Sequence, residues 1–374
     1  MHQNKTNPKT KYDAIIVGAG PAGCSCAHEL LKENKKVLII DKANFPRHKP
    51  CAGGITMKAL KELPINIDHL IQHSSQKMMF RFDDNKKIEL QNNTGSCVMV
   101  IREDFDNYYF NETIKMGADF KKIEKITSIQ SLKDKVLINF DGEEYEALYL
   151  IGADGVNSTV RKLSSKLKFK NPVFAYEGLI DKNHNNEEVT EFIFNKHGYA
   201  WIFPKKDHLN VGIGNLIDKG DGQKLKKLDL YNFVQKRFGT AELKNITGFP
   251  IGTEGLNHQT ENNNIFLVGD AAGLAETLLG EGIYNAIISG KYAAKSIIRD
   301  SSDAKRYYNI FLKQLTKELK LYNKGAKILY GYPRISYFMM RLGLGKKFMD
   351  GYSEGKTLTQ IMGRSKSQIS NSIT

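Results

Sequence analysis

The pattern of apolar and polar positions opens with two short β-type runs separated by a helical stretch. The first run covers 14–17, the helical stretch begins near Pro21, and the second run covers 37–40. Short, β-branched apolar runs of this kind are typical of buried parallel strands. The start of the chain therefore predicts a strand–helix–strand unit of an α/β sheet.

The middle of the chain has a different pattern, with short segments that alternate as antiparallel strands do. A hairpin is expected at Asp141-Gly142, because this dipeptide favours the tight turn between paired strands. In chain order the pattern predicts a helix opened by a glycine pair and running through Leu60, strands within 78–101, a helix at 103–116 ended by Gly117, strands within 120–150 and 172–214, a helix at 225–238, and a short strand pair.

Two more strand ends resemble the first in their surroundings. A strand before Asp154-Gly155 leads into a helix that starts near Ser158, and a strand at 265–268 leads through Asp270 to a long helix from Gly282. We expect one discontinuous dinucleotide-binding domain made of 10–50, 97–163 and 258–300. The intervening segments 51–96 and 164–257 would form a β-rich substrate domain, and 301–374 a C-terminal helical region.

The C-terminal region combines helical spacing with positive charge. Within 305–330, apolar residues recur near helical spacing with lysines between them, at Ile310, Phe311, Leu315, Leu319 and Tyr322, and 335–348 is similarly apolar and cationic. A helix of this kind can lie on an anionic membrane. The alternative is a lid packed on the substrate domain with a solvated lysine face; we favour the membrane.

Charge and composition narrow the classes of function. The formal net charge is +14, but 301–374 contributes +10 and residues 1–12 contribute +3, so the remainder is almost neutral and gives no nucleic-acid-binding surface. No apolar run is long enough to cross a bilayer, and the polar N-terminus lacks a secretion signal. Cys24, Cys26, Cys51 and Cys97 do not form a metal-ligand pattern, so we expect no metal, and Cys24 and Cys26 as packing residues.

The glycines at the first strand–helix turn carry the clearest chemistry. Gly18, Gly20 and Gly23 have GxGxxG spacing, in which the first permits the turn, the second admits a pyrophosphate and the third lets helix pack on strand. Asp41 ends the second strand, where a carboxylate accepts hydrogen bonds from a ribose. The alternative is a tight turn with no ligand.

The cofactor expected from this pattern is FAD. GxGxxG occurs once, so a second nucleotide has no dedicated unit of its own. Asp270 beside the start of a helix suits a polyol or phosphate edge of the same nucleotide. A resident FAD is therefore favoured over an NAD-only dehydrogenase.

Two further motifs carry a resemblance to a known family. HKPCAGGI at 48–55 and GYAWIFP at 198–204, followed seven residues later by Gly212-Ile213-Gly214, resemble the motifs of the FAD-dependent geranylgeranyl reductase family. The GxGxxG, Arg102, Asp154-Gly155 and Gly269-Asp270 features are shared with the wider group that includes aromatic-hydroxylating flavoprotein monooxygenases. Halogenases have a similar WxWxIP stretch, but Tyr199 and Phe203 depart from it.

The resemblance implies an α/β fold with a Rossmann-type FAD-binding domain, an inserted antiparallel sheet and a C-terminal helical region. Asp41 departs from the Glu of many relatives but keeps the hydrogen-bonding role. The cofactor-binding residues expected from motif and resemblance together are Gly18, Gly20, Pro21, Ala22, Gly23, Asp41, Lys42, Cys51, Ala52, Gly53, Gly54, Arg102, Asp154, Asp270, Gly280, Gly282 and Ile283.

The expected chemistry is reduction of an isolated prenyl double bond. Reduced flavin supplies the hydride, Cys51 lies within reach of the reacting carbon, and the faces of Tyr199 and Trp201 line the pocket and stabilise positive charge. The alternatives are that Cys51 only fills space and that both aromatics only pack a core. His28 is expected to be structural, whereas Arg47 and His48 could bind phosphate or be solvated.

Three functions stay open at this point. The leading one is a geranylgeranyl reductase acting on a phospholipid, quinone or chlorophyll precursor, with NAD(P)H or a ferredoxin as electron donor. The others are an aromatic-ring monooxygenase and a non-catalytic prenyl carrier, which would be colourless when purified. We expect a cytoplasmic protein attached to the inner face of the cell membrane; the sequence gives no oligomeric state.

Overall fold

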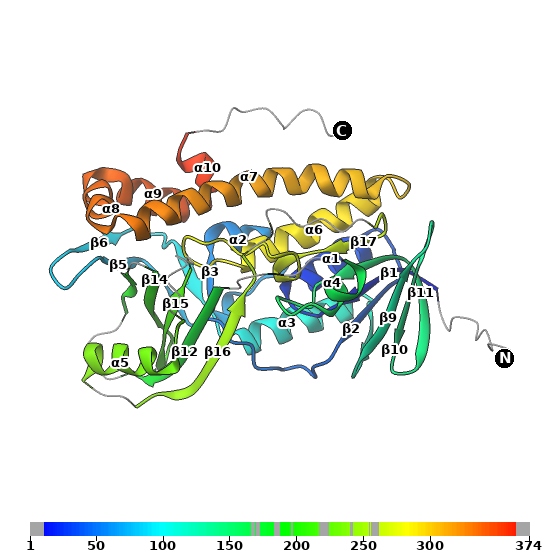
Figure 1. Ribbon diagram of the computed structural model, residues 1–374, viewed down its shortest axis with the longest axis horizontal. Coiled ribbons are helices and arrows are strands. Elements are labelled where there is room, and N and C mark those ends of the chain that lie inside the picture. The colour runs from blue at the N-terminus through cyan, green and yellow to red at the C-terminus, as the bar shows by residue number, and fades with distance from the viewer. Residues whose placement is uncertain are drawn as a thin grey trace.

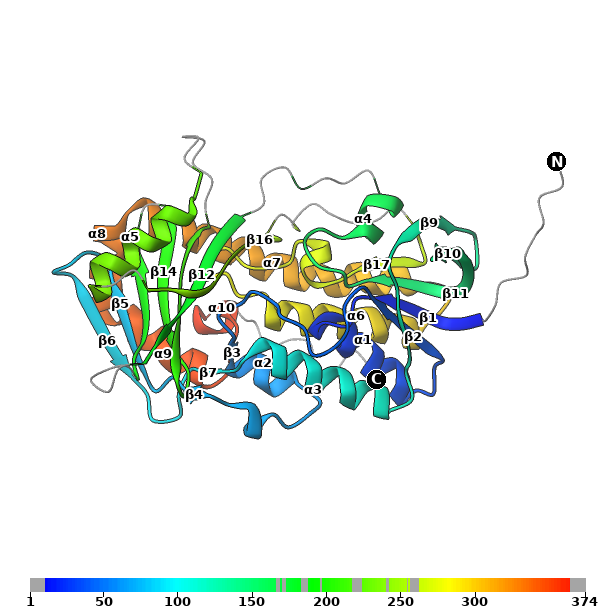
Figure 2. The same cartoon turned by 90° about the horizontal axis from the view of Figure 1, so that it is seen from below.

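The computed structural model describes residues 11–165, 169, 173–182, 188–195, 197–216, 224–239, 242–253, 255 and 262–363. Two large sheets lie at opposite ends of the molecule, with α2 and α3 between them (Figure 2). A long C-terminal helix runs along one side, across both sheets (Figure 1). The expected α/β class with a C-terminal helical region is confirmed.

The first sheet has the order β8-β2-β1-β11-β10-β9, with β17 paired to β11. Its strands are β1 Lys11–Val17, β2 Val37–Asp41, β8 Asp119–Lys122, β9 Ile126–Ser131, β10 Val136–Phe140, β11 Glu143–Gly152 and β17 Ile265–Leu267. β1 is parallel to β2 and β11, and β11 is parallel to β17. Segments far apart in sequence thus bring their carboxyl ends to one edge, where α/β sheets bind ligands.

Helices cover this sheet and start at that edge. α1 Pro21–Lys32 follows β1, α3 Arg102–Lys115 precedes β8, and α6 Ile283–Arg299 packs closely on α1. Cys24 and Cys26 are fully buried in α1, as expected of packing residues, and His28 is buried beside them. Burial lowers the pKa of His28, which suits a structural imidazole.

The second sheet has the order β16-β12-β15-β14-β13-β5-β6. Its strands are β5 Lys77–Arg81, β6 Lys87–Gln91, β12 Val173–Asp181, β13 Thr190–Phe194, β14 Gly198–Pro204, β15 His208–Asn215 and β16 Lys244–Ile251. α5 Lys227–Phe238 packs on one face through Leu230 and Val234. Every residue of β14 is buried, because both faces of this strand are covered.

Two expectations for this region need correction. The sheet is not purely antiparallel, since β13 pairs with β5 in parallel; the β5–β6 hairpin comes from an earlier segment and joins at the edge. Before β17 the described residues contain one strand, β16, rather than a pair, and 256–261 lie outside them.

A small third sheet joins the two larger ones. It consists of β3 Gly54–Thr56, β4 His73–Ser74 and β7 Cys97–Met99. The glycine pair therefore opens a strand, and the expected helix, α2 Met57–Glu62, starts only after Thr56 caps it. A short 3-10 turn, Asp68–Leu70, and α4 Thr159–Ser164, capped by Ser158, complete this part.

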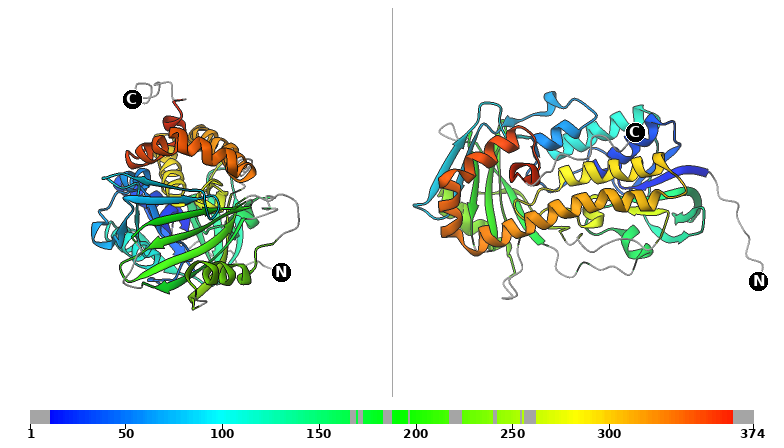
Figure 3. Two further views of the ribbon diagram at one scale, coloured as in Figure 1. Left: turned by 90° about the vertical axis from the view of Figure 1, so that its left-hand side faces the viewer. Right: turned by 90° about the horizontal axis from the view of Figure 1, so that it is seen from above.

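The C-terminal region consists of α7 Ala304–Gly331, α8 Pro333–Met339, the irregular turn η4 Met340–Leu344, α9 Gly345–Ser353 and α10 Leu358–Ile361. These helices cap one side of the molecule (Figure 3). The apolar face of α7 is buried through Leu315, Leu319 and Tyr322, so this face packs as a lid and is not free for a membrane. Ile310 instead faces outward, 42% exposed, because it lies off that face. No helix among the described residues is long and apolar enough to span a bilayer.

Candidate functional site

One cavity of about 940 Å³ connects the edge of the first sheet with the inner face of the second sheet and the C-terminal helices. Its volume is near the upper end of ligand pockets, about 300–1,000 Å³. Every residue expected to bind the cofactor lines it except Gly23, and so do Tyr199 and Trp201. The structure thus brings together residues from the whole length of the chain.

The glycine-rich turn forms one end of the cavity. Gly18 has a φ of +106°, and a Cβ on Gly23 would lie 1.9 Å from the Gly18 carbonyl oxygen. Gly23 therefore sets how closely α1 approaches the turn, while Gly18 and Gly20 face the cavity. No acidic residue or side-chain cap occupies the start of α1, so its positive end is open to an anion.

Asp41 lies where a ribose would be recognised. Its carboxylate accepts hydrogen bonds from Ala19 N, at 2.8 Å, and Ala43 N, at 2.9 Å. These bonds fix the carboxylate at the end of β2, and Lys42 beside it also lines the cavity.

The two later aspartates have different surroundings. Asp154 stabilises the N-terminus of α4 from outside the helix, since its carboxylate accepts hydrogen bonds from the hydroxyl of the cap residue Ser158, at 2.5 Å, and from the Thr159 and Val160 amides. These hydrogen bonds occupy the Asp154 carboxylate at the start of α4. Asp270 faces the start of α6 near Gly282, and burial raises its pKa although Lys49 and Arg102 oppose this.

Positive side chains gather between these aspartates and Cys51. Arg102 forms a two-point hydrogen-bonded pair with Asp106, at 2.8 and 2.9 Å, and Arg47 Nη2 lies 3.0 Å from the same carboxylate. Arg47 Nη1 is buried without a hydrogen-bond partner among the described residues. His48 also lines the cavity, and its side chain is exposed.

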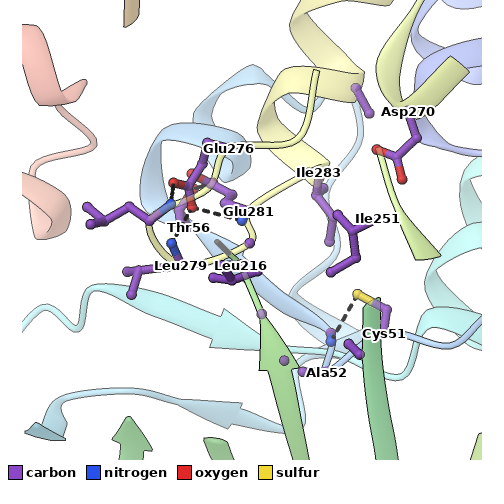
Figure 4. Close-up of a pocket in the computed structure, with 18 of the residues that line it drawn as sticks. Cys51, Ala52, Thr56, Leu216, Ile251, Asp270, Glu276, Leu279, Glu281 and Ile283 are labelled. Atoms are coloured by element: carbon purple, nitrogen blue, oxygen red, sulfur yellow. Dashed lines mark hydrogen bonds between the residues drawn. The ribbon is translucent and has the colours of Figure 1, made fainter. Parts of the chain in front are cut away.

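Cys51 lies on a loop between the two sheets. Its backbone N–H donates to Glu177 Oε1 at 2.9 Å, and Gly53 N–H donates to its Sγ at 3.4 Å. Figure 4 shows Cys51 and Asp270 pointing toward the same space, with Ile251 and Ile283 beside it. Lys205 also contacts this loop, because its Nζ donates a hydrogen bond to Ala52 O at 2.7 Å.

Tyr199 and Trp201 form a wall of the cavity, with ring centroids 5.8 Å apart. The Tyr199 hydroxyl donates to Leu279 O, and Trp201 Nε1 donates to Asn210 Oδ1 at 2.7 Å. With these polar atoms bonded, the rings present their apolar surfaces.

The GxG pair on β15 makes room for this wall. Gly212 lies opposite Trp201 and Gly214 opposite Tyr199. A Cβ on Gly212 would lie 2.1 Å from Trp201 Cζ2, whereas the nearest atom to a Cβ on Gly214 is 3.7 Å away.

We expect Gly212→Ala to displace the Trp201 ring and to lower the free energy of unfolding by about 1–3 kcal/mol, the usual cost of overpacking. Urea denaturation followed by tryptophan fluorescence measures this, since Trp201 is the single tryptophan of the chain. Gly214→Ala is the matched control and should unfold like the wild type. Equal stability and emission for both variants would contradict this account.

The far end of the cavity is apolar. Its walls come from the second sheet and from the C-terminal helices, and include Phe80, Phe192, Phe194, Leu216, Leu329, Met340, Leu344, Phe348 and Met349. This end suits a long hydrocarbon chain, because aromatic and aliphatic side chains exclude water and offer no polar partner.

A polar cluster next to this wall was not anticipated from the sequence. Glu276 accepts hydrogen bonds from Leu279 N and Glu281 N, and burial raises its pKa to about 7. Glu281 accepts from the Thr56 hydroxyl and pairs with Lys58, 2.7 Å away. Glu281 lies between Gly280 and Gly282, so its place in a glycine-rich loop was the available signal.

The residues present fit FAD. The glycine turn, the open start of α1 and the unpartnered Arg47 nitrogen suit a pyrophosphate, and Asp41 suits a ribose. The loop from Cys51 to Gly54 leaves space beside Asp270 for a planar ring system. Among the described residues no group of His, Cys, Asp and Glu could hold a metal ion.

Comparisons with known proteins point to a flavoprotein. A family model described as FAD binding domain matches residues 11–299. The digeranylgeranylglycerophospholipid reductase of Methanococcus vannielii is 31% identical, over 81% of this chain and 80% of the relative.

Solved structures show the fold. A geranylgeranyl bacteriochlorophyll reductase-like protein from Thermoplasma acidophilum superposes with a TM-score of 0.75 at 21% identity, over 94% of this chain and 95% of that one. A flavin-dependent brominase superposes with a TM-score of 0.74 at 18% identity, over 92% and 94%. Two chemistries share this fold, so the fold alone does not select one.

Proposed function

Because this chain belongs to the FAD-dependent geranylgeranyl reductase family, we propose that it reduces carbon–carbon double bonds of a prenyl chain carried by a lipid, quinone or related isoprenoid. The observation that carries the proposal is one cavity that joins a nucleotide-binding turn, the Cys51 loop and an apolar end. A prenyl chain in the apolar end would reach the space beside Cys51.

FAD, when bound, supplies the hydride for this reaction. The protein supplies the rest of the chemistry. The Cys51 thiol gives a proton to the second carbon, and the faces of Tyr199 and Trp201 stabilise the positive charge that develops. The apolar walls keep water away from the reacting carbons.

The electron donor belongs to the same proposal. We infer NAD(P)H or a ferredoxin, since the described residues contain one glycine-rich dinucleotide unit and the cofactor would occupy it. Anaerobic mixing of the oxidised holoprotein with each donor, followed at the flavin absorbance, separates the two.

Mass spectrometry of lipids and quinones from cells with and without the protein tests the function. Reduction adds hydrogens in pairs to a prenyl chain, and the masses identify the carrier. An aromatic-ring monooxygenase would instead consume oxygen in proportion to NAD(P)H, and a carrier would leave the masses unchanged. Either result would overturn the proposal.

We also propose that the protein attaches to the inner face of the cell membrane through α8 and η4. Ile335, Phe338, Met339 and Leu342 are exposed there, Leu342 by 85%, and Arg334, Arg341, Lys346 and Lys347 flank them. Met339 also lines the cavity, so the cavity reaches this surface. Apolar side chains amid cations suit the interface of an anionic bilayer.

We expect the protein to float with phosphatidylglycerol vesicles, and Phe338→Ser with Leu342→Ser to weaken binding at least about tenfold. Each side chain loses roughly 1.5–3 kcal/mol of apolar burial. Leu228→Ser is the matched control, because Leu228 is also exposed but lies on α5. A wild-type protein that stays at the bottom of the gradient would refute membrane attachment.

A further inference from the structure

A buried glutamate lies directly behind Cys51. Glu177 is 4% exposed and is not among the residues that line the cavity. One carboxylate oxygen, Oε1, accepts the Cys51 N–H at 2.9 Å, and the other, Oε2, has no hydrogen-bond partner among the described residues. Burying a carboxylate costs free energy, so its position against the loop that carries Cys51 calls for an explanation.

The strand register places Glu177 in line with Trp201, one of the two residues of the aromatic wall. Glu177 on β12 lies opposite Gly212 on β15, and Gly212 lies opposite Trp201 on β14. Residues opposite each other on neighbouring strands share a face, and the Trp201 indole occupies the space that a side chain at Gly212 would take. Asn210 lies next to both groups: it accepts from Trp201 Nε1 at 2.7 Å, and its side chain is near the Glu177 carboxylate.

The charged groups that face Glu177 come from two other elements. Lys205, 3% exposed, donates to Ala52 O at 2.7 Å and Val100 O at 3.0 Å, and Arg102 approaches from the start of α3. A carboxylate and an ammonium thus hold the Cys51–Ala52 segment through its backbone N–H and C=O. Burial raises the pKa of Glu177 and lowers the pKa of Lys205 to about 8.

Three cations lie beside the Cys51 side chain: Arg102, which hydrogen-bonds to it, Lys49 and Lys205. We propose that Glu177 is a positioning residue that directs the Cys51 side chain into the cavity and offsets the positive charge of these cations. This inference rests on the proposed function, in which the Cys51 S–H bond breaks, a C–H bond forms, and reduced FAD provides the hydride. The resulting thiolate takes up a proton from solvent before the next turnover. A negative charge behind the loop disfavours the thiolate and so favours that uptake.

The rate of Cys51 alkylation by iodoacetamide, followed by mass spectrometry from pH 5 to 10, tests the proposal without substrate. Cys24, Cys26 and Cys97 are buried and serve as internal controls. Glu177→Gln keeps an acceptor for the Cys51 N–H but removes the charge. We expect the midpoint of the alkylation profile to fall by about one pH unit, the size of shift caused by one nearby charge. An unchanged midpoint would overturn the proposal.

Two further variants make the result specific. Glu191→Gln is the matched control, because Glu191 is equally buried in the same sheet but pairs with Arg81 and Arg237, and its midpoint should not move. Lys205→Gln removes the opposite charge and should raise the midpoint; this variant still tests the proposal if Glu177→Gln does not fold. A midpoint that moves downward in Lys205→Gln would contradict charge control.

Steady-state kinetics separates this inference from the proposed function. Glu177→Gln should lower kcat with little change in KM, because the side chain does not line the cavity. If alkylation shifts as expected but no protein variant reduces a prenyl chain, the proposed function fails while the Glu177–Cys51 coupling is upheld. If prenyl reduction is measured and alkylation does not shift, the coupling fails alone.

Discussion

Replacing Gly23 by alanine is expected to destabilise the protein and abolish its FAD content. The new Cβ would lie 1.9 Å from the Gly18 carbonyl oxygen and 3.1 Å from Ile16 Cγ2. A backbone oxygen cannot rotate away as a side chain can, so α1 must move off the turn. Overpacking typically costs about 1–3 kcal/mol, and we expect the upper end of this range. Urea denaturation and the flavin-to-protein absorbance ratio measure the two effects.

Gly20→Ala is the informative control. A Cβ on Gly20 meets only Arg47 Nη2, at 3.5 Å, so the free energy of unfolding of the FAD-free protein should stay near the wild-type value. FAD affinity should still fall, because the backbone at the second glycine must approach the pyrophosphate. Two outcomes would refute the different roles assigned to Gly20 and Gly23: an equal loss of stability in both variants, or a Gly23→Ala protein that retains FAD.

Replacing Cys51 by alanine or serine is expected to lower turnover about 10²-fold, the lower end of what a positioned proton donor contributes. The FAD content should stay at the wild-type level, because the loop is tied to Glu177 through the backbone N–H of Cys51, which any replacement retains. Prenyl reduction under single-turnover conditions, with flavin absorbance recorded on the same sample, provides the measurement.

Cys97→Ala is the matched control for this experiment. Cys97 also lines the cavity, but its thiol is buried on β7 and burial raises its pKa to about 11. Turnover of Cys97→Ala should remain close to the wild-type rate. Full turnover of Cys51→Ser at full FAD content would show that Cys51 only fills space beneath the cofactor.

The nucleotide end of the site could be predicted from the sequence because its signals are local. Three glycines at fixed spacing, a proline at the start of a helix and an aspartate at the end of the next strand lie within one short segment. The conformation of each follows from neighbours along the chain, and the structure places them at one edge of the sheet.

The charged residues behind Cys51 could not be found in this way. Glu177 and Cys51 are 126 residues apart, and they meet only because a loop crosses the inner face of β12. The one local hint is that Glu177 shares the strand phase of the buried Ala175, where an apolar residue is expected. The sequence marks Glu177 as unusual but does not identify its partner.

For the C-terminal helices, too, the sequence could predict an apolar face but not the residues that pack against it. Helical spacing predicted an apolar face within 305–330 but not what covers that face. In the structure the face packs inward, and the exposed apolar residues lie in α8 and η4 instead. Pattern alone identifies an amphipathic helix, whereas its partner is decided by the tertiary fold.

The cavity wall is drawn from residues as far apart as Val17 and Met362. A molecule bound there touches both large sheets and the terminal helices at once, so its binding free energy is shared by all of them. Removing the last helices would therefore lower the affinity for the nucleotide at the opposite end of the cavity. With a ligand bound, the sheets and helices that line the cavity would unfold in one cooperative transition.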